Sequence, residues 1–305
     1  MTIFVCGATG TQGGAIARHL LATNIAVHAL TRDASSPRSQ ALEATGVTLS
    51  PGDYDDSGSL RAALQGCTGL FLNLSPNLAD LSQELTQAKH ILSIAKSAGV
   101  QHVVYSSGLV HEPHRRKHWD PDSFTGRIIL SKIAVENAVR TAGFNFYTIL
   151  RPGYFMSNFL VPYIAFMYPG LTETGTVVTA YTADTVLPLV DPYDIGQFGA
   201  AAFREPGRFH AQEIAIASEV LRLEGIMGAL GRATGRALEV RFMEEGEIER
   251  RKSTDMFLGG QLMGRDMAES VDMDEVRAWG IALGRFQAFL ERERARVVET
   301  FGLPG

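Results

Sequence analysis

Short apolar runs alternate with helix-like segments along the first 150 residues. The runs at residues 3–6, 25–30, 47–50, 69–74, 100–105 and 144–150 have the length and β-branched content of buried strands. Segments between them carry apolar side chains at helical spacing, at residues 15–21, 40–45, 59–64, 81–98 and 123–142. This alternation predicts an α/β fold with a doubly wound parallel sheet.

Residues 150–305 lack that regular alternation. Short apolar strands at 176–180 and 214–217 are interleaved with helices at 218–232 and 275–296, which predicts a smaller C-terminal α+β domain. We therefore expect one domain over residues 1–152, with a segment near 180–205 returning to it. A second domain, mainly for substrate binding, is expected over residues 153–305. The methionines around 256–267 suit either an adaptable apolar pocket or ordinary core filling.

The composition is that of an ordinary globular protein, with 45% hydrophobic and 20% charged residues. The net charge of −5 argues against a nonspecific nucleic-acid or anionic membrane surface. Cys6 and Cys67 fall in or beside predicted strands, so we expect buried core residues and no disulfide framework. We expect no signal peptide, and the apolar stretch 154–168 is too short to span a bilayer. We expect a cytoplasmic protein.

A glycine-rich turn, Gly7-x-x-Gly10-x-x-Gly13, joins the first strand to the first helix. Gly7 allows a sharp exit from the strand, Gly10 lets the backbone approach a pyrophosphate, and Gly13 lets the helix pack on the sheet. The free N–H groups and the dipole at the helix N-terminus favour a diphosphate. The turn therefore predicts a dinucleotide site, with a purely structural corner as the alternative.

The end of the second strand carries the residues that would read the adenosine ribose, about 20 residues after the turn. An acid there binds the 2′-hydroxyl of NAD, whereas an arginine accommodates the 2′-phosphate of NADP. Arg32 comes first and Asp33 follows it. A guanidinium binds a phosphate through two parallel hydrogen bonds, so we expect NADP(H) as the cofactor. The alternative is that Arg32 is a solvated charge.

Polar residues also follow the next three strands. Asp53 and Tyr54 would lie at the edge where ligands bind in open α/β sheets, and Asp55 or Asp56 is expected to cap the following helix. The fourth strand leads into Asn73, Leu74 and Ser75, on the nicotinamide-ribose side. Ser106 and Ser107 end the fifth strand. Their placement resembles that of a hydroxyl that short-chain reductases use to hold a substrate carbonyl, and the alternative is that the serines simply terminate the strand.

The irregular segment 109–121 contains His111, His114 and His118. Two prolines and three adjacent cations make it a poor zinc site, and no cysteine supports one, so we expect no metal. We expect instead a mobile basic loop beside the mouth of the active site.

Together these motifs resemble those of the NmrA-like proteins, which are atypical short-chain dehydrogenase/reductases. The resemblance covers roughly the first 200 residues. It rests on residues 7–14 (GATGTQGG), Thr31-Arg32, the Gly-Asp-x-Asp-Asp of 52–56, Tyr105-Ser106-Ser107, Ser131-Lys132-x-x-x-Glu136, residues 150–159 and residues 191–196.

The resemblance implies a Rossmann domain that binds NADP(H) and a smaller domain that covers the substrate. The cofactor-binding residues expected from the motifs and the resemblance together are Gly7, Ala8, Thr9, Gly10, Thr11, Gln12, Gly13, Arg32, Asp53, Tyr54, Asn73, Leu74, Ser75, Ser106, Lys132, Gly153, Tyr154 and Phe155.

The helix at 123–142 departs from the superfamily in one respect. Most short-chain reductases carry Tyr-x-x-x-Lys there, and the lysine lowers the pKa of the tyrosine so that it donates a proton. Here Lys132 is present, but Ile128 stands in place of the tyrosine. We expect Lys132, Ser106 and Tyr154 to be the catalytic residues.

The resemblance does not settle the activity, because relatives reduce quinones, carbonyls or carbon–carbon double bonds, sense redox state or rearrange metabolites. We expect an NADPH-dependent oxidoreductase for a lipophilic carbonyl, quinone, enone or imine. The alternatives are a non-catalytic redox sensor with a protein partner and a non-redox isomerase with a structural cofactor.

Overall fold

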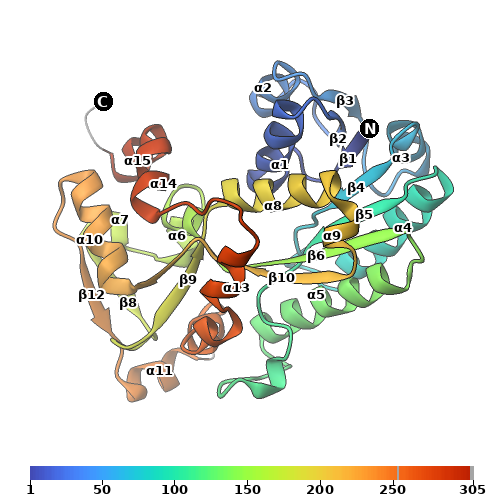
Figure 1. Ribbon diagram of the computed structural model, residues 1–305. Coiled ribbons are helices and arrows are strands. Elements are labelled where there is room, and N and C mark those ends of the chain that lie inside the picture. The colour runs from blue at the N-terminus through green and yellow to red at the C-terminus, as the bar shows by residue number, and fades with distance from the viewer. Residues whose placement is uncertain (253, 303–305) are drawn as a thin grey trace. The chain divides into compact units, whose positions relative to one another are not determined.

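The computed structural model describes residues 1–252 and 254–302, and the chain forms two compact units (Figure 1). Unit 1 comprises Met1–Gly108, Ile128–Arg151 and Ile195–Ile214. Unit 2 comprises Leu109–Arg127, Pro152–Asp194 and Ala215–Gly305. This division differs from the expected one, because residues 109–127 belong to unit 2 and the returning segment is 195–214. The two units are therefore of nearly equal length.

Unit 1 is built on a seven-stranded sheet whose order, from one edge, is β3-β2-β1-β4-β5-β6-β10. The pairs from β3 to β6 are parallel, with Phe4 opposite His28 on one side and Leu70 on the other. The first six strands have the order of a dinucleotide-binding fold, which confirms the predicted doubly wound sheet. The strands are β1 (Thr2–Val5), β2 (Ala26–Thr31), β3 (Thr48–Pro51), β4 (Gly69–Leu72), β5 (His102–Ser106), β6 (Phe146–Pro152) and β10 (Gln212–Ile216).

Helices cover both faces of this sheet (Figure 1). A large apolar core joins the strands to α3, α4 and α5 on one face. On the other face α8 packs closely on α1, because a Cβ at Gly196 would lie 2.9 Å from the Ala15 carbonyl oxygen. The helices are α1 (Thr11–Ala22), α2 (Pro37–Glu43), α3 (Ser57–Leu64), α4 (Gln83–Ser97), α5 (Phe124–Thr141), α8 (Pro192–Arg204) and α9 (Pro206–Phe209).

Helix starts in unit 1 follow local chemistry. Ser36 accepts a hydrogen bond from the backbone N–H of Ser39, and Pro37 occupies the first turn of α2. Asp56 caps α3 by accepting from Gly58 and Ser59, so the expected cap is present at the second of the two aspartates. Helix α1 begins at Thr11, four residues before the predicted segment. Glycines in its first turn have no apolar side chain, so hydrophobic periodicity could not reveal them.

Unit 2 contains two small sheets and several short helices. One sheet has the order β11-β9-β7, and the other pairs β12 with β8. Its aromatic core includes Phe159, Tyr168, Phe286 and Phe289. The strands are β7 (Tyr154–Phe155), β8 (Thr176–Thr179), β9 (Val186–Val190), β11 (Glu219–Arg222) and β12 (Glu239–Phe242). The helices are η1 (Pro113–Arg115), η2 (Met156–Phe159), α6 (Ile164–Met167), α7 (Leu171–Thr174), α10 (Leu223–Thr234), α11 (Glu245–Arg251), α12 (Leu258–Gly264), η3 (Met267–Ser270), α13 (Met273–Ala278), α14 (Phe286–Arg292) and α15 (Arg294–Phe301).

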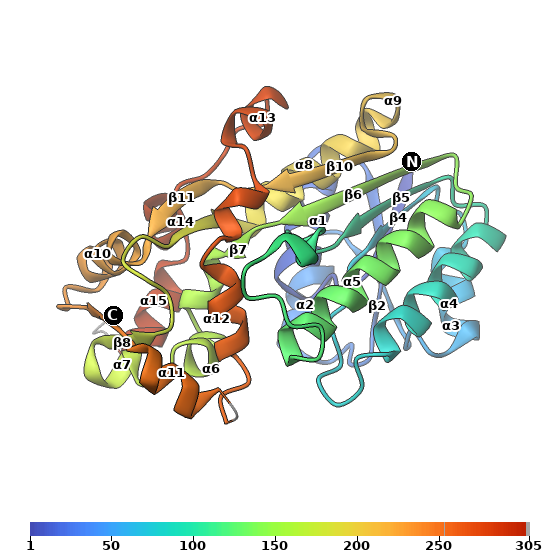
Figure 2. The ribbon, with the colours of Figure 1, turned by 90° about the horizontal axis from the view of Figure 1, so that it is seen from below.

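Two helices predicted for unit 2 were wrong in extent. Residues 219–222 form β11, which pairs antiparallel with β9, and only then does α10 begin. The predicted helix 275–296 is three separate helices, α13, α14 and α15 (Figure 2). Gly280 has a φ of +67°, which a continuous helix does not permit, and the backbone N–H of Gly284 donates to Asp194 instead of to a helical carbonyl.

None of the helices in the described part of the chain combines the length and the hydropathy needed to cross a lipid bilayer.

Candidate functional site

A pocket of about 530 Å³ lies in unit 1 where β1, β2, β3 and β4 end. Parallel strands present their carboxyl ends at one edge, which is where such sheets bind ligands. Eight of the predicted cofactor-binding residues line this pocket. Seven more belong to unit 1 but are not part of the lining: Ala8, Gly10, Thr11, Gln12, Gly13, Ser106 and Lys132. The lining residues are Gly7, Thr9, Leu30, Thr31, Arg32, Asp33, Gly52, Asp53, Tyr54, Asp55, Asn73, Leu74, Ser75, Asn77, Gln83 and Gln87.

The glycine turn requires its first glycine for its backbone conformation and its last glycine for lack of room. Gly7 adopts a φ of +63°, and a Cβ at Gly13 would lie 2.2 Å from the Gly7 carbonyl oxygen. The Gly10 N–H donates to that same oxygen at 2.9 Å, which closes the turn. Gly10 has no side chain to cap α1, so the first N–H groups of the helix are left for an anion. This cradle fits a dinucleotide pyrophosphate.

Three side chains connect the turn to the ends of β4 and β5. Gln12 donates from Nε2 to Asn73 Oδ1 at 3.2 Å, and Ser106 Oγ donates to Gln12 Oε1 at 2.6 Å. Ser106 is almost fully buried. Its hydroxyl hydrogen is thus used within the protein, so in this arrangement it does not donate to a substrate carbonyl. Ser107 is the neighbouring serine that is not engaged with Gln12.

Tyr54 and Asp53 are fixed by backbone groups. The Tyr54 hydroxyl oxygen accepts from the Gly7 N–H at 2.7 Å, and burial, together with the nearby Cys6, holds the pKa of Tyr54 well above its usual range. Asp53 accepts from the Asp55 N–H at 3.0 Å. Tyr54 therefore braces the glycine turn and also lines the pocket.

Arg32 and Asp33 have different surroundings at the end of β2. Asp33 Oδ1 accepts from the backbone N–H and the hydroxyl of Ser35, at 2.9 and 2.6 Å, and these hydrogen bonds lower the pKa of Asp33. Its carboxylate is thus directed to its own loop. Arg32 is exposed, lines the pocket, and has no ion-pair partner among the residues that the structure describes. Of the two residues, Asp33 has one carboxylate oxygen engaged by its own loop, whereas the Arg32 guanidinium is unpaired among the described residues.

Lys132 lies on α5 and contacts Leu74, a residue that lines the pocket. Its Nζ donates to the Leu74 carbonyl oxygen at 2.9 Å and forms an ion pair with Glu84 Oε1 at 2.5 Å. Sequence reasoning missed Glu84. A signal was present, because Glu84 shares the inward face of α4 with Ala88, Ile91 and Ala95. An acid at an apolar helix position predicts a buried partner.

Gly153, Tyr154 and Phe155 belong to unit 2. The Gly153 N–H donates to the Ile216 carbonyl at 2.9 Å, and Phe155 pairs with Val190 across β7 and β9. The Tyr154 hydroxyl lies 2.8 Å from that of Tyr168. Burial raises the pKa of Tyr154 to about 12, and hydrogen bonds to neighbouring side chains only partly oppose it. A raised pKa makes the Tyr154 hydroxyl a weaker acid, whereas a proton-donating tyrosine has a lowered pKa.

The segment expected to be a mobile loop is anchored at Arg116. Its side chain is only 10% exposed, and its guanidinium donates to the Asp266 carbonyl at 2.8 Å and also contacts the Ser270 hydroxyl. These contacts explain why residues 109–127 belong to unit 2. No group of three or more histidine, cysteine, aspartate or glutamate side chains is arranged to hold a metal among the described residues.

Glu136, the last residue of the Ser131-Lys132-x-x-x-Glu136 motif, connects elements of unit 1 through ion pairs. Glu136, four residues after Lys132, is buried and forms ion pairs with Arg140 and Arg151, each at 2.7 Å. Glu213 completes the network, at 2.6 Å from both arginines. The network links α5 to β6 and β10 rather than facing the pocket.

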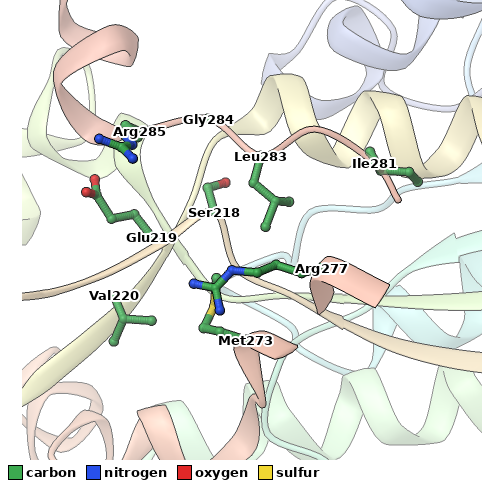
Figure 3. A pocket seen from close by; sticks show the side chains of 9 residues that line it. All are labelled: Ser218, Glu219, Val220, Met273, Arg277, Ile281, Leu283, Gly284 and Arg285. Atoms are coloured by element: carbon green, nitrogen blue, oxygen red, sulfur yellow. The ribbon is translucent and has the colours of Figure 1, made fainter. Parts of the chain in front are cut away.

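Unit 2 contains a hollow of its own, of about 590 Å³ (Figure 3). None of its lining residues was predicted from the sequence to be functional. Arg277 of α13 and Leu283 of the loop before α14 are directed into it (Figure 3). The lining combines apolar and charged side chains: Ser218, Glu219, Val220, Met273, Arg277, Ile281, Leu283, Gly284 and Arg285.

Several oxidoreductases are similar to this chain in sequence. An NmrA-like family domain-containing oxidoreductase of Aspergillus japonicus is 34% identical over 185 residues, which cover 57% of this chain and 52% of the relative. The match therefore spans about half the length of that relative. Quinone oxidoreductase 2 of Escherichia coli is 29% identical over 186 residues, covering 60% of each chain.

Solved structures share the fold at lower sequence identity. Triphenylmethane reductase of Citrobacter sp., complexed with NADP(H), has a TM-score of 0.74 and 20% identity, covering 96% of this chain and 99% of that one. NmrA, a negative transcriptional regulator in complex with NADP, has a TM-score of 0.73 and 22% identity, covering 96% and 97%.

The sequence profile of the NmrA-like family matches residues 1–269, which is most of the chain. The sheet order, the glycine turn and the similar proteins all agree with that match. The chain belongs to the NmrA-like family.

Proposed function

We propose that this protein is an NADPH-dependent oxidoreductase that reduces a lipophilic carbonyl, quinone, enone or imine. The observation that carries the proposal is the unit 1 pocket, in which the side-chain-free glycine turn and the exposed Arg32 lie at one sheet edge. Relatives named as oxidoreductases, a quinone oxidoreductase among them, support the reaction class.

The residues present fit an NADP(H) molecule. The N-terminus of α1 would hold the pyrophosphate, and Arg32 would bind the 2′-phosphate through its guanidinium. Asp53 and Tyr54 would lie beside the adenine, and Lys132 would hold a hydroxyl of the nicotinamide ribose. A phosphate is favoured over a free ribose hydroxyl because Arg32 is exposed and unpaired among the described residues, whereas Asp33 already accepts from Ser35 with one oxygen.

When bound, NADPH would supply a hydride to the acceptor, which must also gain a proton. Lys132 is a candidate to orient the ribose and to relay the proton, directly or through water. Ser106 donates to Gln12 and the Ser107 hydroxyl is buried, so a substrate oxygen could reach either serine only after a local rearrangement. Tyr154, with its raised pKa, suits a neutral hydrogen-bond donor rather than a proton source. Unit 2 as the substrate-binding unit stays a prediction.

A redox sensor is the second candidate. Ile128 replaces the proton-donating tyrosine, and NmrA, a transcriptional regulator of the same fold, was crystallised with NADP. In this case the same pocket binds the cofactor, no turnover follows, and a protein partner distinguishes NADPH from NADP.

The test is to mix the protein with NADPH and a panel of quinones, enones and imines while following the absorbance of reduced nicotinamide. Consumption that depends on both protein and acceptor supports the oxidoreductase, and Lys132→Met should abolish it. Tight binding without consumption would overturn the oxidoreductase and favour the sensor or an isomerase.

A further inference from the structure

Glu84 is a carboxylate buried without any exposed surface, in a helix whose inward neighbours are apolar. Removing a carboxylate from water costs several kcal/mol unless it is paired and hydrogen-bonded. Glu84 meets this condition through Lys132 at Oε1 and through the Ser131 hydroxyl, which donates to Oε2 at 3.0 Å. An apolar residue of similar volume would fill the position at lower cost. Stability alone therefore does not explain why a glutamate occupies position 84.

The ion pair determines where the Lys132 ammonium lies. Its long, flexible stem would otherwise allow many positions. Glu84 from α4 and the Leu74 carbonyl from the end of β4 each take one of its three hydrogens. Leu74 lines the unit 1 pocket, so the ammonium is held beside a residue of the pocket lining. The Lys132 side chain is 15% exposed, and its Nζ lies 6.0 Å from the centroid of the Tyr105 ring, but no third oxygen or nitrogen acceptor contacts it among the described residues.

We propose that Glu84 is a positioning residue that fixes Lys132 for the cofactor. It holds the ammonium so that the remaining N–H is available to a ribose hydroxyl of the bound dinucleotide. The inference rests on the proposed function, because it needs the dinucleotide in the unit 1 pocket. Ser131 precedes Lys132 on α5 and donates to the other oxygen of Glu84, so α5 contacts both carboxylate oxygens of Glu84.

The test is a double-mutant cycle on NADPH affinity, measured by nicotinamide fluorescence with the full chain. Glu84→Gln keeps the size and an acceptor oxygen but removes the charge. We expect it to weaken NADPH binding about tenfold in the wild-type background, as for a lost hydrogen bond to a charged group. In a Lys132→Met background the same substitution should change the affinity less than twofold, because there is no ammonium left to position.

Two controls separate positioning from a general loss of stability. Glu43→Gln, at an exposed position on α2, should leave NADPH affinity unchanged. Glu84→Met with Lys132→Met replaces the buried pair by apolar side chains, so it should fold and should bind NADPH like Lys132→Met alone.

Equal losses from Glu84→Gln in both backgrounds, or no loss in the wild-type background, would overturn the positioning role and leave the proposed function intact. Wild-type protein that binds no dinucleotide would overturn both.

Discussion

At the scale of single residues, the site depends on positions where a side chain is excluded. A Cβ at Gly13 would come within 2.2 Å of the Gly7 carbonyl oxygen and 2.8 Å of the Ala8 Cα. Both atoms belong to the backbone of the turn, so neither moves without opening the turn. The space that Gly13 leaves is what allows α1 to start directly behind the strand.

Gly13→Ala should therefore destabilise the protein by at least about 2 kcal/mol and should weaken NADPH binding. Urea unfolding and a fluorescence titration would measure the two effects. Gly207→Ala is the matched control, because a Cβ there meets no atom within 4 Å. The free energy of unfolding of the Gly207→Ala variant should differ from that of the wild type by less than about 1 kcal/mol. A Gly13→Ala protein as stable as Gly207→Ala would contradict this account of the turn.

The two cysteines give a second prediction at this scale. Burial raises the pKa of Cys6 to about 12 and that of Cys67 to about 11. Since the thiolate is the reactive form, neither residue should react with a thiol reagent in the native protein at mildly alkaline pH. Both should react after unfolding in urea. Rapid labelling of a native thiol would show that the strands around it open.

The predicted residues that line the pocket come from local patterns in the sequence. Gly7, the first glycine of the turn, and Arg32, at the end of β2, are examples that line the pocket. The partner of Lys132 is not local, since Glu84 precedes it by 48 positions. The use of the Ser106 hydroxyl by Gln12 likewise depends on a contact across 94 positions. Such pairs follow only once the sheet order is known.

At the scale of elements, an ion-pair network fastens α5 to the strands beside it. Arg151 of β6 contacts Glu136 of α5 and Glu213 of β10, both within 2.7 Å. Burial raises the pKa of Glu213, but the hydrogen bond from Arg140 and the charges of the two arginines outweigh burial, so its pKa is lowered from 4.5. The folded state thus favours the ionised carboxylate.

A group with a lowered pKa stabilises the fold above its unfolded pKa and loses that effect as the pH falls through its folded pKa. Glu213→Gln should therefore reduce the free energy of unfolding by on the order of 1 kcal/mol near neutral pH, and less in acid. Urea unfolding across the acid range would measure this. Glu205→Gln, which removes an exposed ion pair with Arg208, should have a much smaller effect. Equal pH dependence in both variants would contradict the role given to the network.

Element boundaries were predicted well in unit 1 and less well in unit 2. Regular alternation of strand and helix leaves little freedom in the first unit. In unit 2, residues 219–222 form a strand by pairing with the edge of β9. The local sequence of residues 219–222 contains no signal for that pairing. The break at Gly280 was readable in principle, since glycine with a positive φ ends helices.

At the scale of the whole molecule, the chain forms two compact units, and the pocket assigned to the cofactor lies entirely in unit 1. A ligand that binds only the folded state stabilises it by mass action. NADPH at about one hundred times its dissociation constant should therefore add roughly 2.7 kcal/mol to the free energy of unfolding. Thermal unfolding with and without NADPH would measure this, and an unchanged Tm would contradict binding to the folded chain.

The claim on which both the oxidoreductase and the sensor depend is that the unit 1 pocket selects NADPH through Arg32. The most direct measurement is a fluorescence titration with NADPH and NADH, on wild-type protein and on Arg32→Gln. We predict tighter binding of NADPH by wild type, and a variant whose NADPH affinity falls about tenfold or more while its NADH affinity barely changes. Equal affinities for both dinucleotides in wild type, or no binding of either, would contradict the account.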